Sequence, residues 1–204
     1  MKQAHRDKYL RENLNDYLER IEENEVKKEY LTGEELKKLA ATPCKIPVLK
    51  SASLFSCLTG LRISDILNLK WEHIQMAPDR GYCIRIRTQK TQTEATLPIS
   101  MEAYELCGEP DTGTVFKGFK RSMAQHPLKE WLKSAGITKS MSFHCFRHSY
   151  AVLQVSAGTD IYTVSKMMTH KKVSTTQIYA DLVTMPHKDV WKPKGQEIPG
   201  LSRI

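Results

Sequence analysis

The stretch His144-Cys145-Phe146-Arg147-His148 opens an apolar pattern that predicts a helix over residues 144–157. In a helix, His144 and Arg147 lie three residues apart on one face, so both side chains can reach the same group. The planar guanidinium of arginine donates two hydrogen bonds to a phosphate and stays protonated. This stretch therefore predicts a site for an anionic ligand such as a phosphate.

Two distant segments carry residues of the same kind. Upstream, Arg62 lies within Thr59-Gly60-Leu61-Arg62-Ile63-Ser64-Asp65, in a turn that Gly60 makes between two predicted helices. Downstream, Tyr179 follows His170 by nine residues. If the fold brings them together, Arg62 and Arg147 can clamp both non-bridging oxygens of one phosphate, which is the main demand of phosphoryl transfer.

Tyr179 is the candidate nucleophile. A free tyrosine has a pKa of ~10, so at neutral pH about one molecule in a thousand is a phenolate, and a base or cation must assist it. His144 and the two arginines are the candidates for that assistance. Lys90, expected near the tip of a hairpin, is a candidate general acid for a leaving 5′-oxygen. His170 is a candidate to bind the phosphate or to assist proton transfer.

Taken one at a time, these residues also fit structural roles. Arg62 fits a surface ion pair, Lys90 a solvated loop lysine, and Tyr179 a core aromatic. His144 and His148, four residues apart, resemble a metal-binding pair. The glutamate of an H-E-x-x-H helix and an obvious third ligand are both missing, so we expect no metal.

The charge of the chain favours a polyanionic partner. The net charge is +8, and residues 31–204 carry 24 Lys and Arg against 15 Asp and Glu. Nucleic acid is the natural partner of such a surface, because each neutralised phosphate releases counterions. The candidate phosphate contacts are Lys117, Lys120, Arg121, Lys171 and Lys172.

The remaining composition predicts a soluble, cytoplasmic protein. No apolar run approaches the ~18 residues of a membrane span, and the N-terminus has no signal-peptide core. The five cysteines are scattered without a C-x-x-C pair, which argues against both a disulfide framework and a zinc site.

Start signals and periodicity divide the chain into three parts. Residues 1–28 are charged and hold too few apolar groups to fold alone. Thr32 and Glu35 form a capping-box pattern, with Leu31 placed to contact Leu36, and the core is expected to begin there. Alternation over 82–88 and 95–99 predicts a hairpin. Helical patterns cover 33–41, 47–58, 64–69, 101–107, 121–134, 144–157, 160–169 and 174–184, and prolines and glycines mark an irregular tail over 186–204.

As an ordered set, these motifs resemble the catalytic domain of the tyrosine recombinases, the integrase family of site-specific DNA recombinases. The resemblance covers about residues 29–185 and is nearest in kind to integrases of mobile elements such as conjugative transposons. It implies a mainly α fold (α+β), a helical bundle with a small antiparallel β-sheet. The catalytic positions that it implies are Arg62, Lys90, His144, Arg147, His170 and Tyr179, with Asp65 as an acidic residue that supports them.

The resemblance also implies a reaction and a set of partners. Tyr179 would attack a phosphate of double-stranded DNA to give a 3′-phosphotyrosine and a free 5′-hydroxyl, with no ATP, metal or other cofactor. The protein would be a monomer in isolation and a homo-oligomer on DNA, a tetramer in synapsis, assisted by accessory DNA-bending proteins and without any membrane partner. The alternatives are a catalytically silent DNA-binding module of the same fold and a type IB topoisomerase that relaxes DNA.

The chain departs from the family pattern in two places. Family members commonly carry Leu-Gly before the later histidine, where this chain has Met168-Thr169. Many members also carry an N-terminal core-binding domain, and residues 1–28 are too short to form one. We expect residues 1–28 to be a linker or the remnant of such a domain in a longer integrase, with a naturally short member, like the fimbrial-switch recombinases, as the alternative.

Overall fold

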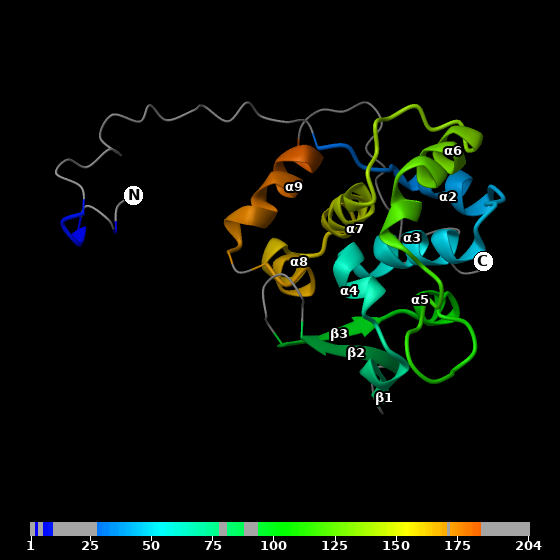
Figure 1. Cartoon of the computed structure of the whole chain (residues 1–204). Helices are drawn as coiled ribbons and strands as arrows, with labels where there is room; N and C mark the ends of the chain where they lie inside the picture. Colours follow the sequence, from blue (N-terminus) through cyan, green and yellow to red (C-terminus); the bar gives the residue numbers. More distant parts are fainter. Residues whose placement is uncertain are drawn as a thin grey trace.

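A computed structural model describes residues 3, 6–9, 28–77, 81–87, 94–170 and 172–184. Within these ranges the fold is mainly helical with one small antiparallel sheet, as the sequence predicts (Figure 1). Lys90, Lys171, the tail 186–204 and most of segment 1–28 lie outside the described residues. The elements are α2 (Gly33–Ala41), α3 (Pro47–Thr59), α4 (Ile63–Leu67), the 3₁₀ helix η2 (Trp71–His73), β1 (Ile74–Ala77), β2 (Gly81–Arg87), β3 (Glu94–Ile99), α5 (Met101–Glu105), the 3₁₀ helix η3 (Arg121–Ala124), α6 (His126–Ser134), α7 (His144–Ser156), α8 (Ile161–Met167) and α9 (Ser174–Thr184).

Helix α2 begins at the predicted capping box. The Glu35 amide donates to Thr32 Oγ1 at 3.3 Å, and the Thr32 amide donates to Glu35 Oε2 at 2.8 Å, which satisfies two backbone donors that a helix start leaves free. Lys139 Nζ adds a 2.6 Å ion pair to the same carboxylate. These contacts fix the start of α2. The Leu31 amide connects the segment before α2 to α7 by donating a 2.8 Å hydrogen bond to Ser149 Oγ.

The turn between α3 and α4 depends on Gly60. Its φ of 69° lies in the left-handed region, and a Cβ built there would stand 2.5 Å from Tyr150 Cδ1, so a larger residue meets both backbone strain and a clash. The turn makes Arg62 the N-cap of α4, which starts at Ile63, one residue before the predicted range 64–69. The reason is that the backbone becomes helical directly after the turn, which leaves Ser64 inside the first turn of the helix.

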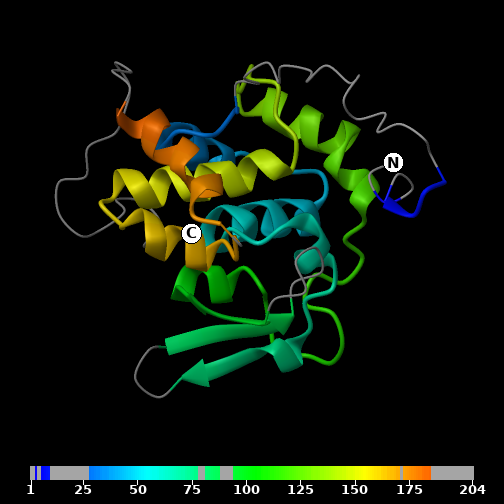
Figure 2. The same cartoon turned by 90° about the vertical axis from the view of Figure 1, so that its left-hand side faces the viewer.

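The sheet has three strands in the order β1-β2-β3, all antiparallel. The predicted hairpin is confirmed as β2 and β3, with Ile84 opposite Leu97 and both side chains buried. Strand β1 was not predicted, because its four residues are too few for a readable alternation. Figure 2 shows the sheet below the helical layer.

The pattern over 121–134 predicted one helix, and the structure has two. Pro127 lies in the first turn of α6. Proline lacks an amide donor and its ring clashes with the carbonyl four residues earlier, so a helix cannot continue through it from η3. Gln125, between the two helices, has φ −105° and ψ −109°. The segment is therefore η3 followed by α6.

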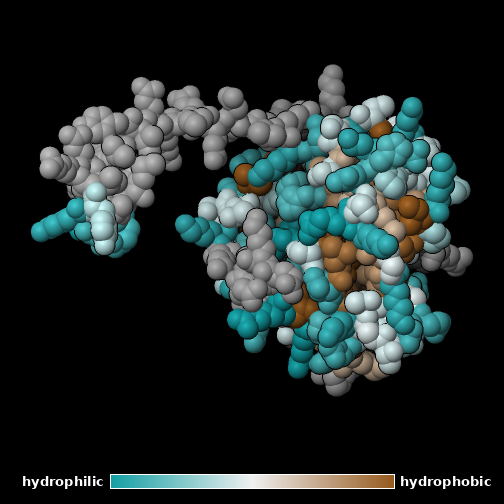
Figure 3. All heavy atoms as spheres, in the orientation of Figure 1, coloured by the Kyte–Doolittle hydropathy of each residue, from teal (hydrophilic) through white to brown (hydrophobic). Residues whose placement is uncertain are grey.

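Helix α7 lies at the centre of the helical layer, between α3 on one side and α8 and α9 on the other (Figure 1). Its outer side packs in a second apolar cluster with residues of α8 and α9, which is made of Tyr150, Ala151, Val152, Val164, Met168 and Tyr179. Among the described residues, no helix is long and apolar enough to cross a membrane. Figure 3 shows a mainly hydrophilic surface on the face that it presents, with a smaller apolar area near its middle.

Candidate active site

Arg147 is the structural centre of the site. Its side chain is only 2% exposed, and its guanidinium donates to the carbonyl oxygens of Gly60 and Met168. These bonds join α7 to the turn before α4 and to the end of α8. Burial, followed by the nearby Arg62, lowers the pKa of Arg147 to about 9. A guanidinium has five N–H donors, so the two carbonyls leave others for a ligand.

Arg62 reaches the same place from the α3–α4 turn. Its Nη1 donates to Thr169 Oγ1 at 3.3 Å. Burial lowers the pKa of Arg62, while Asp65 and Tyr179 act in the opposite direction. Arg62 acts on the pKa of Arg147, Tyr179 acts on the pKa of both arginines, and both arginines act on the pKa of Tyr179. The three side chains therefore share one electrostatic environment.

The backbone at Thr169 adopts the conformation of a glycine. Thr169 has φ 54°, one of two positive values among the described non-glycine residues, and this region is costly for a β-branched side chain. The departure from the Leu-Gly pattern of the resemblance therefore leaves a left-handed turn in place. It also adds a hydroxyl that contacts Arg62.

His170 is fixed by the next turn of chain. Its Nδ1 lies 2.7 Å from Thr176 Oγ1, and its amide donates to the Ser165 carbonyl at 3.0 Å. Burial, then the charges of Arg147 and Arg62, lower the pKa of His170 to about 4. The ring is therefore neutral at pH 7 and faces the arginine pair without competing as a cation.

Tyr179 is buried at 3% exposure in α9. Its Oη lies 2.7 Å from Nδ1 of His148. Burial raises the pKa of Tyr179 to about 12, against the lowering effect of Arg147 and Arg62. The site thus holds the phenol protonated while keeping it beside two cations.

His148 is the site residue that the sequence reasoning missed, since it was considered only as half of a metal pair. The available signal was its position next to Arg147 and one helical turn after His144. The His144 and His148 rings meet edge to face, with centroids 4.6 Å apart. His144 itself is exposed at the first residue of α7.

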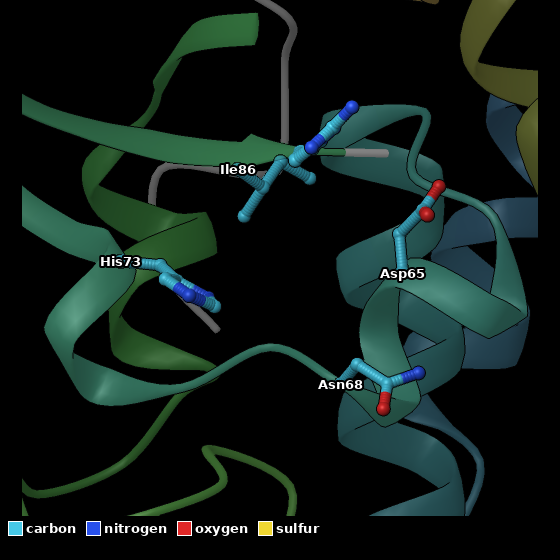
Figure 4. Close-up of a pocket in the computed structure, with 5 residues that line it drawn as sticks. Asp65, Asn68, His73 and Ile86 are labelled. Carbon is cyan, nitrogen blue, oxygen red and sulfur yellow. The ribbon is translucent and has the colours of Figure 1, made fainter. Parts of the chain in front are cut away.

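Asp65 is buried in α4 and raises the pKa of Arg62, next to the guanidinium that the resemblance expects it to support. It also lines a cavity of about 210 Å³ with Asn68, His73, Ile86 and Arg87. Figure 4 shows the cavity between α4 and its C-cap on one side and η2 with β2 on the other.

The candidate DNA contacts fall in two places. Lys117, Lys120 and Arg121 are exposed, and Lys117 forms an ion pair with Asp111. Lys117 and Lys120 precede η3, and Arg121 is its first residue. η3 leads into α6, which lies on the opposite side of α3 from α9 (Figure 1). Lys172 is exposed between His170 and α9. Among the described residues, no group of three or more His, Cys, Asp or Glu side chains could hold a metal ion.

Comparisons with known proteins agree with this architecture. The Phage integrase family matches residues 29–184. Tyrosine recombinase XerD of Lacticaseibacillus casei is 29% identical over 173 residues, which cover 74% of this chain and 58% of the relative. Tyrosine recombinase XerA of Pyrococcus furiosus is 31% identical over 197 residues, which cover 86% of this chain and 66% of the relative.

Solved structures show the same fold. The crystal structure of XerA recombinase superposes with a TM-score of 0.62 at 23% identity, over 87% of this chain and 67% of that one. A lambda integrase (75–356) dimer bound to a COC′ core site gives a TM-score of 0.65 at 19% identity, over 85% and 68%. The chain thus belongs to the Phage integrase family and has the catalytic fold of a tyrosine recombinase. It spans between about half and two thirds of the length of the curated relatives that it matches.

Proposed function

We propose that this chain cleaves and rejoins DNA strands at specific sites through Tyr179. The observation that carries the proposal is that Arg62 and Arg147 bind the adjacent residues Thr169 and Met168. Tyr179, from a third segment, lies near enough for both guanidinium groups to lower its pKa. The Tyr179 oxygen attacks a DNA phosphorus, the bond to the 5′-oxygen breaks, and a 3′-phosphotyrosine forms. The 5′-hydroxyl of the partner strand then attacks this linkage, so the phosphoester energy is kept without ATP or a metal.

Each residue of the site has a role in this scheme. Arg62 and Arg147 bind the non-bridging oxygens, and the loss of one such donor typically costs about a hundredfold to a thousandfold in rate. His170, held neutral, donates a hydrogen bond to the phosphate. Exposed His144 meets the DNA at the mouth of the site, and Lys90 protonates the leaving oxygen.

DNA is the partner that this reaction needs. Similar folds are solved in complexes, among them XerH bound to its difH substrate and the Tn1549 transposon integrase with transposon right end DNA. We propose residues 29–185 as the catalytic domain of an integrase of a mobile element, monomeric alone and tetrameric on two DNA sites. Lys117, Lys120, Arg121, Lys171 and Lys172 contribute basic charge to the DNA surface.

Trapping of a covalent complex tests the proposal. A duplex with a nick next to the scissile phosphate loses the short 5′-fragment after cleavage, so rejoining fails and the protein stays attached. We expect the wild-type chain, incubated with nicked duplexes from the DNA that flanks its own gene, to form a covalent band in denaturing gels. Tyr179→Phe should abolish the band and keep DNA binding, while Tyr162→Phe, at an exposed position of α8, should retain both.

The outcomes separate the alternatives. A covalent band that persists in Tyr179→Phe contradicts the nucleophile. Binding to DNA without any band in the wild type favours the silent module. Relaxation of supercoiled DNA without exchange between two sites favours the topoisomerase.

A further inference from the structure

The contact between His148 and Tyr179 is built into the core of the protein. His148 lies on the second turn of α7, and its Nδ1 is 2.7 Å from Tyr179 Oη. Helix α7 packs against α9, and Tyr150, Val152 and Tyr179 belong to the same apolar cluster. Because both backbones are fixed by this packing, the ring and the hydroxyl meet before any DNA is present.

The groups around the pair keep the His148 ring neutral. His148 faces Lys28 from the segment before α2, His144 and Arg147 from α7, and His170 from the loop after α8. Burial first, and then these groups, lower its pKa to about 4. The ring is neutral at pH 7, and a phenol O–H is a strong donor. With the His148 proton on Nε2, Nδ1 is the acceptor in this 2.7 Å contact and the Tyr179 hydroxyl donates to it.

We propose that His148 is the proton acceptor for Tyr179 in strand cleavage and holds its hydroxyl in line before attack. This inference rests on the proposed function. In the step, the O–P bond forms and the Tyr179 proton passes to Nδ1 as the bond to the 5′-oxygen breaks. The leaving oxygen takes its proton from the general acid. In rejoining, the His148 imidazolium returns the proton to the departing phenolate.

The same electrostatics keep the pair inert without DNA. Burial raises the pKa of Tyr179 to about 12, far above that of His148, so the proton stays on the phenol. A bound phosphate adds negative charge beside Arg147, and so offsets one of the charges that, after burial, disfavour a His148 imidazolium. Proton transfer becomes accessible when the phosphorus is in place to receive the oxygen.

Two substitutions separate positioning from proton transfer. In His148→Asn, the amide oxygen can take the place of Nδ1 and accept the hydrogen bond, but it cannot accept the proton at neutral pH. His148→Ala removes both functions. Because general-base catalysis is worth at least about a hundredfold, we expect single-turnover cleavage by His148→Asn to fall about a hundredfold, and by His148→Ala at least as far. His126→Asn, exposed in α6, should cleave at the wild-type rate.

A changed leaving group shows on which side of the reaction His148 acts. A 5′-bridging phosphorothiolate expels a thiolate, whose conjugate acid has a pKa of ~8.5, so it leaves without a general acid. We expect this substrate to restore cleavage in variants of the general acid and to leave His148→Asn as slow as on normal DNA. Wild-type rates in His148→Asn, or rescue by the phosphorothiolate, would overturn the proposal.

A measurement without DNA keeps the inference testable on its own. In ¹⁵N-histidine spectra at pH 7, we expect an unprotonated Nδ1 at His148 that shifts in Tyr179→Phe. A protonated Nδ1 would contradict the inference even if a substrate were never found. Conversely, a wild-type chain that forms no covalent complex while its Nδ1 is unprotonated would reject the proposed function and leave the contact in place.

Discussion

The strained backbone at Thr169 can be tested by comparing Thr169→Gly with Thr169→Ala. Thr169 is 8% exposed and has φ 54°, and its hydroxyl accepts the bond from Arg62. Both substitutions remove the hydroxyl and lose the same hydrogen bond, worth about 0.5–1.5 kcal/mol. The difference between the two variants therefore isolates the backbone.

The magnitude follows from two opposing effects. Alanine keeps the left-handed penalty of about 1–2 kcal/mol, which glycine avoids. Glycine loses more chain entropy on folding, about 0.5–1 kcal/mol relative to alanine. We expect the glycine variant to be more stable than the alanine variant by about 0.5–1 kcal/mol. At an ordinary helical position, such as exposed Lys129 in α6, the order should reverse, with alanine more stable by about 1 kcal/mol.

Thermal and urea unfolding of the four variants measure the effect. For a chain of this size, 1 kcal/mol shifts the unfolding midpoint by about 2–4 °C. If Thr169→Ala is as stable as Thr169→Gly or more so, the left-handed conformation at residue 169 is wrong. Thr169→Ser, which keeps the hydroxyl, should retain the contact with Arg62 and cleave faster than Thr169→Ala.

Two further predictions concern stability. Gly60→Ala should destabilise the protein by about 2–4 kcal/mol in urea unfolding, because the new Cβ combines a left-handed backbone with a 2.5 Å approach to Tyr150. Gly33→Ala is the control, since a Cβ at residue 33 meets nothing within 4 Å. Equal losses of stability at both sites would refute the packing argument. The pKa values of His148 and His170 lie near 4 in the folded chain and near ~6.5 when unfolded. The unfolded chain therefore binds more protons between these values, and stability should fall as the pH falls from about 6.5 to 4, less so in His170→Asn; a free energy of unfolding that is constant over this range would contradict the assigned burial.

Local patterns were sufficient for most of the elements. The capping box at Thr32 and the alternation of β2 and β3 rest on contacts between residues close in sequence, so they could be predicted directly. Short elements were not predictable in this way. Strand β1 exists because β2 offers it a paired edge, and the split between η3 and α6 depends on how one proline is accommodated.

The residue types of the candidate site were readable because phosphate chemistry demands them. Arginine, histidine and tyrosine in one order are a strong signal even when each residue alone is ordinary, and the family match over residues 29–184 confirms the class of protein. Their partners were not readable. What marks His148 as a site residue is the 2.7 Å contact with Tyr179 Oη that the packing of α7 on α9 creates.

The sequence by itself determined the family, the main helices and the set of groups that phosphoryl transfer would use, because these follow from side-chain chemistry and short-range periodicity. Tertiary structure alone decided that Arg147 binds the carbonyls of Gly60 and Met168, that Thr169 takes a glycine-like turn, and that Tyr179 meets His148. These contacts join residues from about 20 to 90 positions apart, and the burial that shifts their pKa values exists only once the helices have packed.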